Sequence, residues 1–574
     1  MAKKIEIKIN NKKIIAEEGQ TVLQAAEANG LYIPTLCWHS DLEIKPNCRI
    51  CVVQIKGQKG LPTSCSTYVS EGMEVITESE EIAKARQVNM ELIFAQHREE
   101  CNDCVYMYNC QIKDLAKKFN STITRFPDRK NKFPTYQFST ALQYDSSKCI
   151  DCGNCVEICH KQGVDFLTYE KDNTFFNVVP TKDKNIDCIY CGQCLIHCPV
   201  GAFEGVGEFE GVEKPLLDKN KIVVFQFAPS VRVSIGEEFG LEPGAIVTEK
   251  LSAGLKMLGA DYVFDVAVGS DVTTIEEAKE FIERVEANGT LPMFTSCCPS
   301  WVKYIEFFYP EFIPNLTTVR SPQINLGGLI KTYWAQSKKI DPKNIVVVSV
   351  MPCVAKKWEM NRPELKINGL KPVDYVLTTR ELAYLFKKHK IDLPNLKPKS
   401  LDDPLGRPTG SGVIYGAVGG VMESALRTVY FQLTGQKLPN ICWQNSSDIL
   451  GLQEATLKIK NKEYKVAFVS GSGPAEKLLK KLQKKQVKYD YVEVMACPGG
   501  CIGGGGQPVP TNQKIRAKRA KSLFNIDVAS KLKAAQDSPE MKKLYAEYFT
   551  DKKIIHKICH THFNKTTKQV HPVK

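Results

Sequence analysis

The sequence predicts a multidomain protein of mixed class, with α+β units over the first 210 residues and a layered α/β unit after them. Three observations predict this. The chain has 574 residues, which is too long for a single hydrophobic core. Its 22 cysteines fall mainly in short-spaced groups before residue 200. From about Leu216, apolar runs of strand length alternate with helical patterns, as in layered α/β domains.

Composition excludes several classes of protein. Hydrophobic residues make up 43% and charged residues 25% of the chain, a balance typical of globular proteins rather than disordered ones. The sequence contains no run of 18 apolar residues, so no membrane span is expected. The opening MAKKIEIKIN has no apolar signal segment, so a cytoplasmic protein is expected. A disulfide scaffold would be short and secreted, so the cysteines are expected to bind metal.

The formal net charge of +13 counts every cysteine as neutral. Thiolates in iron–sulfur clusters would lower it, so no nucleic-acid partner is expected, whereas attraction to an acidic protein is allowed.

Residues 1–78 predict a small sheet domain with four thiols in loops. Alternating isoleucines at 5–9 and a second strand at 12–16 flank Asn10-Asn11, which predicts a hairpin. Thr21 is typical of a helix N-cap, and the helix is expected to run to about Ala28. The thiols that follow are Cys37, Cys48, Cys51 and Cys65. Their pattern favours a β-grasp [2Fe–2S] domain, with a zinc site as the alternative.

Residues 79–138 predict a helix at about 80–96 followed by a histidine and three cysteines. The candidate ligands are His97, Cys101, Cys104 and Cys110. One imidazole and three thiolates can bind zinc or a [4Fe–4S] cluster, and their spacing does not decide. The neighbouring segments favour iron.

Residues 139–210 contain an internal repeat, which is the strongest signal in the chain. Cys149-x2-Cys152-x2-Cys155-x3-Cys159 recurs as Cys188-x2-Cys191-x2-Cys194-x3-Cys198-Pro199, with His160 where proline is usual in the first run. In two-cluster ferredoxins, the fourth cysteine of each run binds the other cluster. The predicted ligand sets for two [4Fe–4S] clusters are therefore Cys149, Cys152, Cys155 and Cys198, and Cys188, Cys191, Cys194 and Cys159. Protein fills every ligand position, so these clusters are predicted to conduct electrons rather than bind substrate.

Residues 211–574 predict buried strands at 222–227, 262–266, 293–295, 345–351, 466–469 and 491–495, with helices such as 274–287 and 380–388. Three strands run directly into cysteine, at Cys297-Cys298, at Cys353 and at Cys497 with Cys501. Ligands in α/β sheets bind beyond the carboxyl ends of strands, so these ends are expected to converge on one pocket. Glycines at 499, 500 and 503–506 would let backbone approach a bulky inorganic group.

The segments Thr295-Ser296-Cys297-Cys298-Pro299, Met351-Pro352-Cys353 to Lys357, and Glu493 to Cys501 resemble the three signature motifs of [FeFe]-hydrogenases. The order of the N-terminal clusters also resembles the large clostridial type. The resemblance implies that Cys298, Cys353, Cys497 and Cys501 hold the [4Fe–4S] part of an H-cluster. Cys501 would bridge to a diiron unit that carries CO, cyanide and an azadithiolate. It also implies roles for Cys297 as proton donor and acceptor, for Lys356 as partner of a cyanide, and for a pocket lining of Ala228, Pro229, Ser230, Gln323, Met351, Tyr415 and Met495.

The same resemblance implies a proton relay from Cys297 through Glu277, Thr317 and Glu280 to Arg284 and solvent. Glu277 and Glu280 are three residues apart on a predicted helix, so they share a face; by itself that pattern is also typical of a solvated helix surface. A thiol suits proton transfer because its pKa is tunable. The relay hydroxyl is a threonine where serine is usual in the family, and Tyr415 stands where phenylalanine is expected.

A further departure is Ile324-Asn325-Leu326-Gly327, where the family usually has a second glutamine and a Met-Phe-Gly stretch. This difference bears on the gas path or on hydrogen bonding to the cluster, and hence on rate and oxygen tolerance.

The resemblance implies reversible oxidation of dihydrogen, with electrons leaving through the accessory clusters to ferredoxin or a similar low-potential carrier. It also implies maturation proteins as partners. A flavin-bearing diaphorase subunit in a bifurcating or NAD(P)-linked complex is the alternative acceptor, because His560-Thr561-His562-Phe563 is similar to catalytic subunits of that type. Two rival classes are an electron-transfer subunit, which would lack the late cysteines, and a sensory or assembly protein, which typically lacks the cysteine at 297.

Three weaker features remain. The basic run 514–521 is interpreted as a solvated helix face, with a docking patch as the alternative. The motif formed by His556, Cys559, His560 and His562 is interpreted as a surface tail with incidental histidines, with metal binding as the alternative. Cys442 is expected to be a buried thiol.

Overall fold

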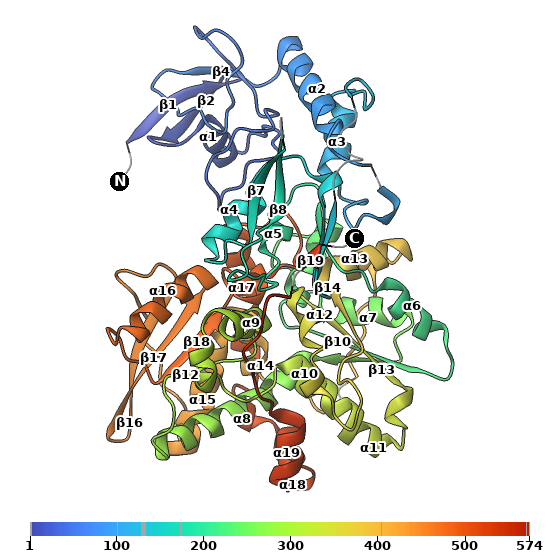
Figure 1. Ribbon diagram of the computed structural model, residues 1–574, viewed down its shortest axis with the longest axis vertical. Coiled ribbons are helices and arrows are strands. Elements are labelled where there is room, and N and C mark those ends of the chain that lie inside the picture. The colour runs from blue at the N-terminus through green and yellow to red at the C-terminus, as the bar shows by residue number, and fades with distance from the viewer. Residues whose placement is uncertain are drawn as a thin grey trace.

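The computed structural model describes residues 3–99, 101–127, 134–172, 175–402, 405–569 and 571–572. Figure 1 shows two sheet-based lobes side by side, with the N-terminal units above them. No helix within the described ranges combines the length and the apolar character that a bilayer crossing requires.

The N-terminal unit is a four-stranded sheet in the order β2-β1-β4-β3 with one helix. The predicted hairpin is confirmed, since Asn10 and Asn11 at its turn both have positive φ. The predicted helix is also confirmed, and Thr21 caps it by accepting a hydrogen bond from the Gln24 N–H. Strands β3 and β4 are too short to produce a periodic signal in the sequence. The elements are β1 (Lys4–Ile9), β2 (Lys12–Glu17), α1 (Val22–Ala28), β3 (Gln54–Ile55) and β4 (Glu74–Ile76).

The next segment carries the remaining cysteines of the first 200 residues. Gly153 and Gly192 have φ values of 76° and 68° and precede α4 and α5, so each places its cysteine run at a helix start. The chain end returns to this region, because β19 pairs with β5. The elements are α2 (Glu80–Phe94), α3 (Gln111–Lys118), β5 (Thr135–Phe138), β6 (Leu142–Asp145), α4 (Asn154–Lys161), β7 (Leu167–Asp172), β8 (Phe175–Pro180), α5 (Gln193–Ile196), β9 (Phe203–Gly205) and β19 (His571–Pro572).

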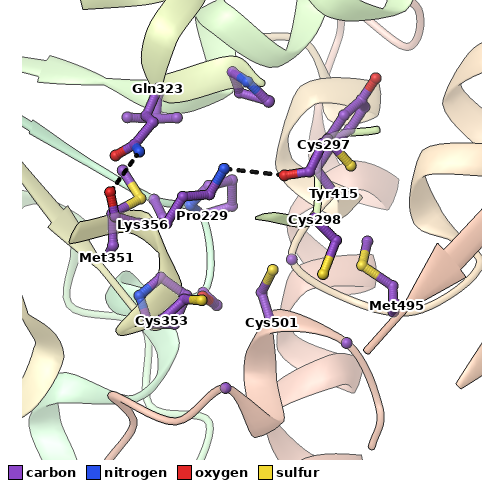
Figure 2. Close-up of a pocket in the computed structure, with 18 of the residues that line it drawn as sticks. Pro229, Cys297, Cys298, Gln323, Met351, Cys353, Lys356, Tyr415, Met495 and Cys501 are labelled. Atoms are coloured by element: carbon purple, nitrogen blue, oxygen red, sulfur yellow. Dashed lines mark hydrogen bonds between the residues drawn. The ribbon is translucent and has the colours of Figure 1, made fainter. Parts of the chain in front are cut away.

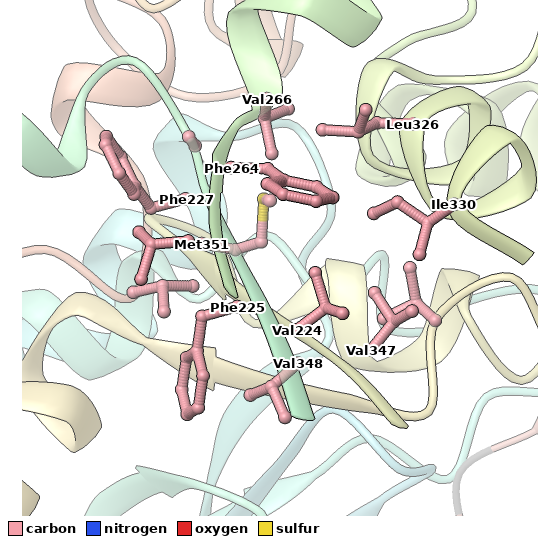
Figure 3. Close-up of a cluster of buried hydrophobic side chains, with 14 of the residues drawn as sticks. Val224, Phe225, Phe227, Phe264, Val266, Leu326, Ile330, Val347, Val348 and Met351 are labelled. Atoms are coloured by element: carbon pink, nitrogen blue, oxygen red, sulfur yellow. The ribbon is translucent and has the colours of Figure 1, made fainter. Parts of the chain in front are cut away.

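The first lobe is an all-parallel sheet in the order β11-β10-β13-β14. Its central strands are buried on both faces, as parallel strands covered by helices require. Figure 3 shows Val224, Val347 and Ile330 packed together in this core. The strands predicted at 222–227 and 345–351 are confirmed at those bounds. The elements are α6 (Phe209–Leu217), β10 (Ile222–Phe227), α7 (Thr248–Leu258), β11 (Tyr262–Asp265), α10 (Pro322–Leu329), α11 (Ala335–Lys338), β13 (Ile345–Met351), α12 (Ala355–Glu359), β14 (Tyr375–Thr378) and α13 (Thr379–Lys388).

The second lobe is a mixed sheet in the order β12-β18-β17-β16-β15. Strands β12, β18 and β17 run parallel, whereas β16 and β15 extend the sheet in antiparallel fashion. Its elements are β12 (Met293–Phe294), α9 (Pro299–Phe308), α14 (Gly410–Ile414), α15 (Gly420–Thr434), β15 (Gln444–Asn445), β16 (Leu452–Ile459), β17 (Lys462–Ser470), α16 (Ser472–Gln483), β18 (Tyr491–Met495), α17 (Gln513–Ala529), α18 (Pro539–Glu547) and α19 (Lys552–Cys559).

The helix predicted at 274–287 starts eight residues earlier than expected. Helix α8 spans Val266–Glu286, and Asp265 caps it by accepting from the Ala267 N–H. Its first half is buried all round, so the amphipathic pattern on which the prediction relied is absent there.

Two surface expectations are wrong. Cys442 is exposed rather than buried. Helix α17, which contains the basic run, is not a purely solvated face: Arg519 is fully buried and forms an ion pair with Glu237, although Lys514 and Lys518 are exposed. The sequence pattern did not reveal the acidic partner, which is 282 residues away.

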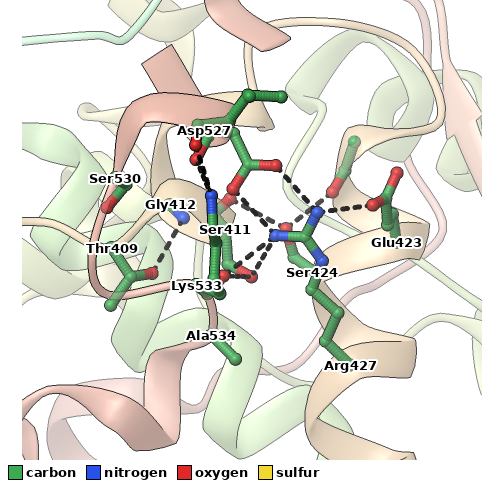
Figure 4. A network of polar contacts seen from close by, with 12 residues as sticks. Thr409, Ser411, Gly412, Glu423, Ser424, Arg427, Asp527, Ser530, Lys533 and Ala534 are labelled. Atoms are coloured by element: carbon green, nitrogen blue, oxygen red, sulfur yellow. Dashed lines mark hydrogen bonds and ion pairs between the residues drawn. The ribbon is translucent and has the colours of Figure 1, made fainter. Parts of the chain in front are cut away.

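A polar network ties α17 to α15 within the second lobe (Figure 4). Arg427 on α15 donates to both carboxylate oxygens of Asp527 on α17, at 2.9 and 2.8 Å, and also to Glu423. A bidentate ion pair of this kind fixes the relative orientation of the two helices as well as holding them together.

Candidate active site

The three cysteine-bearing strand ends meet at the junction of the two lobes. Strand β13 of the first lobe leads to Cys353, while β12 and β18 of the second lead to the other thiols. Figure 2 shows the sulfur atoms of Cys298, Cys353 and Cys501 directed into a shared space. The five cysteines of these three strand ends border the same cavity, namely Cys297, Cys298, Cys353, Cys497 and Cys501.

The cavity has an empty volume of about 710 Å³ and a predominantly apolar wall. The side chains that the resemblance implied as lining border it, namely Ala228, Pro229, Ser230, Gln323, Met351, Tyr415 and Met495. Sequence reasoning did not name four others, Val266, Ser270, Pro322 and Gly416, because they carry no motif.

The donor set fits a large iron–sulfur group. Burial, followed by repulsion from the neighbouring Cys298 thiol, raises the pKa of Cys353 and of Cys501 to about 12. Thiolates crowded in a dry cavity need a multivalent cation to stabilise them, and iron supplies it. The buried Ser230 Oγ and Gln323 Oε1 have no hydrogen-bond partner among the described residues, so polar atoms remain for ligands of such a group.

Glycine is required where turns close against this cavity. A Cβ on Gly500 would lie 2.7 Å from the Val418 nitrogen, and one on Gly504 would lie 2.3 Å from the Pro352 oxygen. The glycine run therefore permits close backbone packing beneath the cysteines.

Lys356 enters the cavity wall as part of a buried ion pair. Its Nζ donates to the Cys297 carbonyl oxygen at 3.0 Å and to both carboxylate oxygens of Glu359, at 3.2 and 3.0 Å. Burial is the largest single effect and lowers the pKa of Lys356, but the Glu359 charge, the hydrogen bond to Glu359 and the charges of Cys297 and Cys353 together outweigh it, so the net shift is upward and the ammonium stays charged. Gln323 Nε2 also donates to Glu359, at 2.6 Å. The sequence did not indicate Glu359.

Cys297 and Glu277 form the inner end of the predicted relay. Burial, and then the Glu277 charge, raise the pKa of the Cys297 thiol, so it is protonated at rest. Burial also raises the pKa of Glu277 to about 8, against a hydrogen bond from Tyr491 Oη at 3.1 Å. Glu277 Oε1 is buried with no hydrogen-bond partner in the described structure. A carboxyl with a pKa near neutrality can both accept and release a proton.

The outer end of the relay converges on Glu280. Thr317 Oγ1 donates to Glu280 Oε2 at 2.8 Å, and Arg284 Nη2 donates to Glu280 Oε1 at 2.5 Å. Thr318, which sequence reasoning missed, donates to Glu280 Oε2 from its backbone N–H and its hydroxyl, both at 2.9 Å. The threonine thus supplies the hydroxyl for which serine is usual.

The fourth cysteine of the second repeated run lies beside the first three cysteines of the first run, while the ligand sets themselves stay a prediction. Cys149, Cys152, Cys155 and Cys198 line one enclosed space of about 280 Å³ with apolar neighbours. Cys188 and Cys194 both lie close enough to Cys191 and Cys159 for their charges to interact, as expected of a second group, and Cys194 is also near Cys155 of the first group. This second group adjoins the active site, because Cys497 Sγ lies 3.8 Å from the Cys191 carbonyl oxygen.

In the N-terminal unit the four thiols lie in two pairs. Cys48 N–H donates to Cys37 Sγ at 3.5 Å, and a hydrogen bond from the Cys37 thiol lowers the pKa of Cys48 to about 6. The Cys65 thiol similarly lowers the pKa of Cys51. Two adjacent thiol pairs suit a [2Fe–2S] cluster, in which each iron takes two cysteines.

The third predicted group has its histidine held by a backbone contact and one of its thiols exposed. His97 Nδ1 bonds to the Lys148 carbonyl at 2.8 Å, which fixes its ring. Cys101 is exposed, and the Cys104 thiol donates to Glu204 Oε1 at 3.4 Å. Cys110 lies at the start of α3. Whether these side chains bind iron or zinc stays a prediction.

A cluster of His39, Asp41 and His197 lies at the contact of the N-terminal unit with the rest, with ligand atoms within 4.8 Å of one another. Arg516 donates to Asp41 Oδ2 at 2.6 Å, and the Asp41 N–H donates to His39 Nδ1 at 3.1 Å. The Arg516 guanidinium thus already binds the Asp41 carboxylate, which a metal ion would need as a ligand. We therefore interpret the cluster as a docking contact between the N-terminal unit and the rest.

Family models match most of the chain. They are "Iron only hydrogenase large subunit, C-terminal domain" at 221–505, "2Fe-2S iron-sulfur cluster binding domain" at 2–80, "4Fe-4S dicluster domain" at 148–202 and "Iron hydrogenase small subunit" at 513–566.

Curated relatives match nearly end to end. The chain is 36% identical to the NADP-reducing hydrogenase subunit HndD of Solidesulfovibrio fructosivorans, over 98% of this chain and 99% of the relative. It is 35% identical to iron hydrogenase 1 of Clostridium pasteurianum, over 94% and 96%. The solved structure of [FeFe]-hydrogenase HydA1 from Chlamydomonas reinhardtii is similar with a TM-score of 0.58 and 36% identity, covering 62% of this chain and 99% of that one. The chain therefore belongs to the [FeFe]-hydrogenases, the iron-only hydrogenase family of oxidoreductases.

Proposed function

We propose that this enzyme interconverts dihydrogen with protons and electrons at an H-cluster held in the cavity between the lobes. Its cubane would bind Cys298, Cys353, Cys497 and Cys501, with Cys501 as the bridge to a diiron unit bearing CO, cyanide and an azadithiolate. When bound, this group would supply heterolytic cleavage of dihydrogen. The observation that carries the proposal is the convergence of four thiols, two of them buried and two partly buried, from three strand ends on one apolar cavity.

The protein's own residues would handle protons and position the group. Cys297 borders the cavity as a protonated thiol, so it is placed to give and take the proton. Glu277, Thr317, Glu280 and Arg284 would then carry it to the surface. Lys356 stays charged through Glu359 and would face an anionic cyanide. The apolar wall keeps bulk water away, so protons move through these groups rather than at random.

Electrons would pass through three [4Fe–4S] clusters and one [2Fe–2S] cluster. The arrangement supports a wire, because electrostatic coupling links Cys48 to Cys152, and Cys155 to Cys194, and Cys497 then lies against Cys191. The proposed units are residues 1–78, 79–138 and 139–210 for the accessory clusters, and 211–574 for the H-cluster.

The proposed electron partner is ferredoxin or a similar low-potential carrier, in the cytoplasm, where reducing conditions favour thiolate clusters. A diaphorase-type subunit is the second candidate, because the relative HndD is named as a subunit of an NADP-reducing hydrogenase. Affinity purification from the native cell separates the two. If a flavin-bearing subunit co-purifies, that subunit and not free ferredoxin is the electron partner.

Infrared absorption tests the H-cluster directly. Protein made together with maturation proteins should show bands of metal-bound CO and cyanide and should evolve dihydrogen from a reduced dye. Cys501→Ala should lose both signals. Cys442→Ala, which alters an exposed thiol, should keep both. Absence of the bands from mature wild-type protein would refute the proposal.

A further inference from the structure

The C-terminal histidine motif lies against the proton relay instead of forming an incidental surface tail. Its backbone is paired with the segment that follows Thr317: the Arg320 N–H donates to the Cys559 oxygen at 2.7 Å, and the Thr561 N–H donates to the Thr318 oxygen at 2.8 Å. His560 lies between these two contacts, so its backbone is held in place from both sides.

A continuous chain of hydrogen bonds joins Glu280 to Glu276 through this ring. Thr318 Oγ1 lies 2.9 Å from Glu280 Oε2 and 2.8 Å from His560 Nδ1. His560 Nε2 lies 3.3 Å from Glu276 Oε2. The two contacts of Thr318 are short enough for direct proton transfer. The longer contact between His560 Nε2 and Glu276 Oε2 needs only a small approach of the two atoms.

The single hydrogen of the Thr318 hydroxyl gives the chain two arrangements. If Glu280 is protonated, it donates to the Thr318 oxygen, and the hydroxyl donates to His560 Nδ1. If His560 is an imidazolium, its Nδ1–H donates to the Thr318 oxygen, and the hydroxyl donates to the Glu280 carboxylate. The arrangements hold the same number of protons and differ by the transfer of one: the Glu280 O–H breaks, the Thr318 hydroxyl exchanges its hydrogen, and an N–H forms on His560.

The groups around the ring place a carboxylate at its Nε2 atom and a solvent-exposed imidazole beside it. Glu276 faces Nε2 as a carboxylate that also accepts from Lys279 Nζ at 2.8 Å and from Tyr545 Oη at 2.6 Å. The Arg320 guanidinium binds the His560 backbone carbonyl, at 2.7 Å, rather than the ring. The exposed ring of His556 stacks on His560, with centroids 5.6 Å apart and planes inclined by 12°.

We propose that His560 is a second proton-exchange site of the enzyme, which takes protons from Glu280 through Thr318 and passes them to solvent beside Glu276 and His556. This branch lies parallel to the exit at Arg284. It rests on the proposed function, because it needs a proton source at Cys297 and Glu277.

The test uses mature full-length protein and compares His560→Asn with His562→Asn. Asparagine keeps a hydrogen-bonding amide near Thr318 but cannot take up a proton. His562 is exposed and has no part in the chain of hydrogen bonds from Glu280 to Glu276, so its variant is the matched control. Dye-linked evolution of dihydrogen is measured between pH 6 and 9 in H₂O and D₂O, and infrared bands of metal-bound CO and cyanide report that each variant carries its cluster.

The expected result for His560→Asn is turnover lower by about tenfold, with a larger solvent isotope effect and unchanged infrared bands, while His562→Asn matches wild type. Imidazole added to His560→Ala should restore most of the rate, because a free base can replace the missing ring.

Equal rates and isotope effects in the two asparagine variants would overturn the proposal. So would a slower His560→Asn with a normal isotope effect and no recovery of His560→Ala by imidazole, since that pattern indicates a structural role. If mature wild-type protein lacks the infrared bands, the proposed function itself fails, and this inference falls with it.

Discussion

Gly192 of the dicluster domain and Gly505 beside the active-site cavity meet through bare backbone. A Cβ added to Gly505 would lie 2.5 Å from the Gly192 Cα and 2.7 Å from the Cys191 oxygen. Gln193 Nε2 also donates to the Gly503 oxygen at 2.9 Å. The proposed electron wire therefore reaches the active site across a contact that tolerates no side chain.

Gly505→Ala should separate these two backbones. Because a rigid backbone contact has no room to adjust, the variant should lose about 1 to 3 kcal/mol of stability and transfer electrons more slowly to the active site. Thermal unfolding and dye-linked turnover measure the two effects. An unchanged unfolding temperature together with an unchanged rate would show that the contact is not tight.

The raised pKa of Glu277 predicts a pH-dependent stability. The carboxyl has a pKa of about 8 in the folded protein, whereas the ordinary pKa of a glutamate carboxyl is 4.5. Between these values the folded state keeps a proton that the unfolded state has lost. Stability therefore falls as pH rises from about 5 to 8, by roughly 1.4 kcal/mol for each step of one in pH.

Glu277→Gln should flatten that dependence, because the amide does not titrate. Unfolding midpoints at pH 5, 6.5 and 8 check this, with Glu283→Gln on the exposed side of the same helix as the control. Parallel pH profiles for wild type and Glu277→Gln would contradict the assignment.

Glu359 is predicted to hold Lys356 in place. Glu359→Gln leaves a buried ammonium without its counter-charge, at a cost of about 3 kcal/mol, and should also lower turnover. The double variant Lys356→Met/Glu359→Leu should regain stability but not activity, because the cation itself is gone. Chemical unfolding together with dye-linked turnover distinguishes the two effects. A double variant as active as wild type would show that the cation has no catalytic role.

Arg516 is predicted to dock the N-terminal unit. Arg516→Ala removes a charged hydrogen bond to Asp41, on the order of 1.5 to 3 kcal/mol, while Lys161 still donates to the Asp41 carbonyl at 2.9 Å. Turnover with a protein carrier that delivers electrons to the proposed [2Fe–2S] cluster should fall several-fold. Turnover with small dyes that deliver electrons directly to the inner clusters should not fall. Lys518→Ala, an exposed residue of the same helix, is the control. An equal loss with both donors would place the defect elsewhere.

The sequence predicted those features that local spacing encodes. A run such as Cys149-x2-Cys152-x2-Cys155 sets its thiols around one loop and helix start, so local spacing is enough to predict the ligand sets of the two proposed clusters. Strands 222–227 and 345–351 were found because strands buried on both faces are continuous apolar runs. The convergence of the late cysteines was expected from the rule that strand ends gather at one edge.

Only the tertiary structure decided which distant charges meet. The pairing of Arg519 with Glu237, the buried start of α8, the exposure of Cys442 and the place of His560 beside Thr318 depend on contacts between residues far apart in the chain. Such contacts leave no periodic pattern, because each partner taken alone is typical of a solvated surface. Spacing therefore carried the prediction of the iron–sulfur chemistry, whereas the docking contacts and the proposed proton routes depend on how the lobes pack.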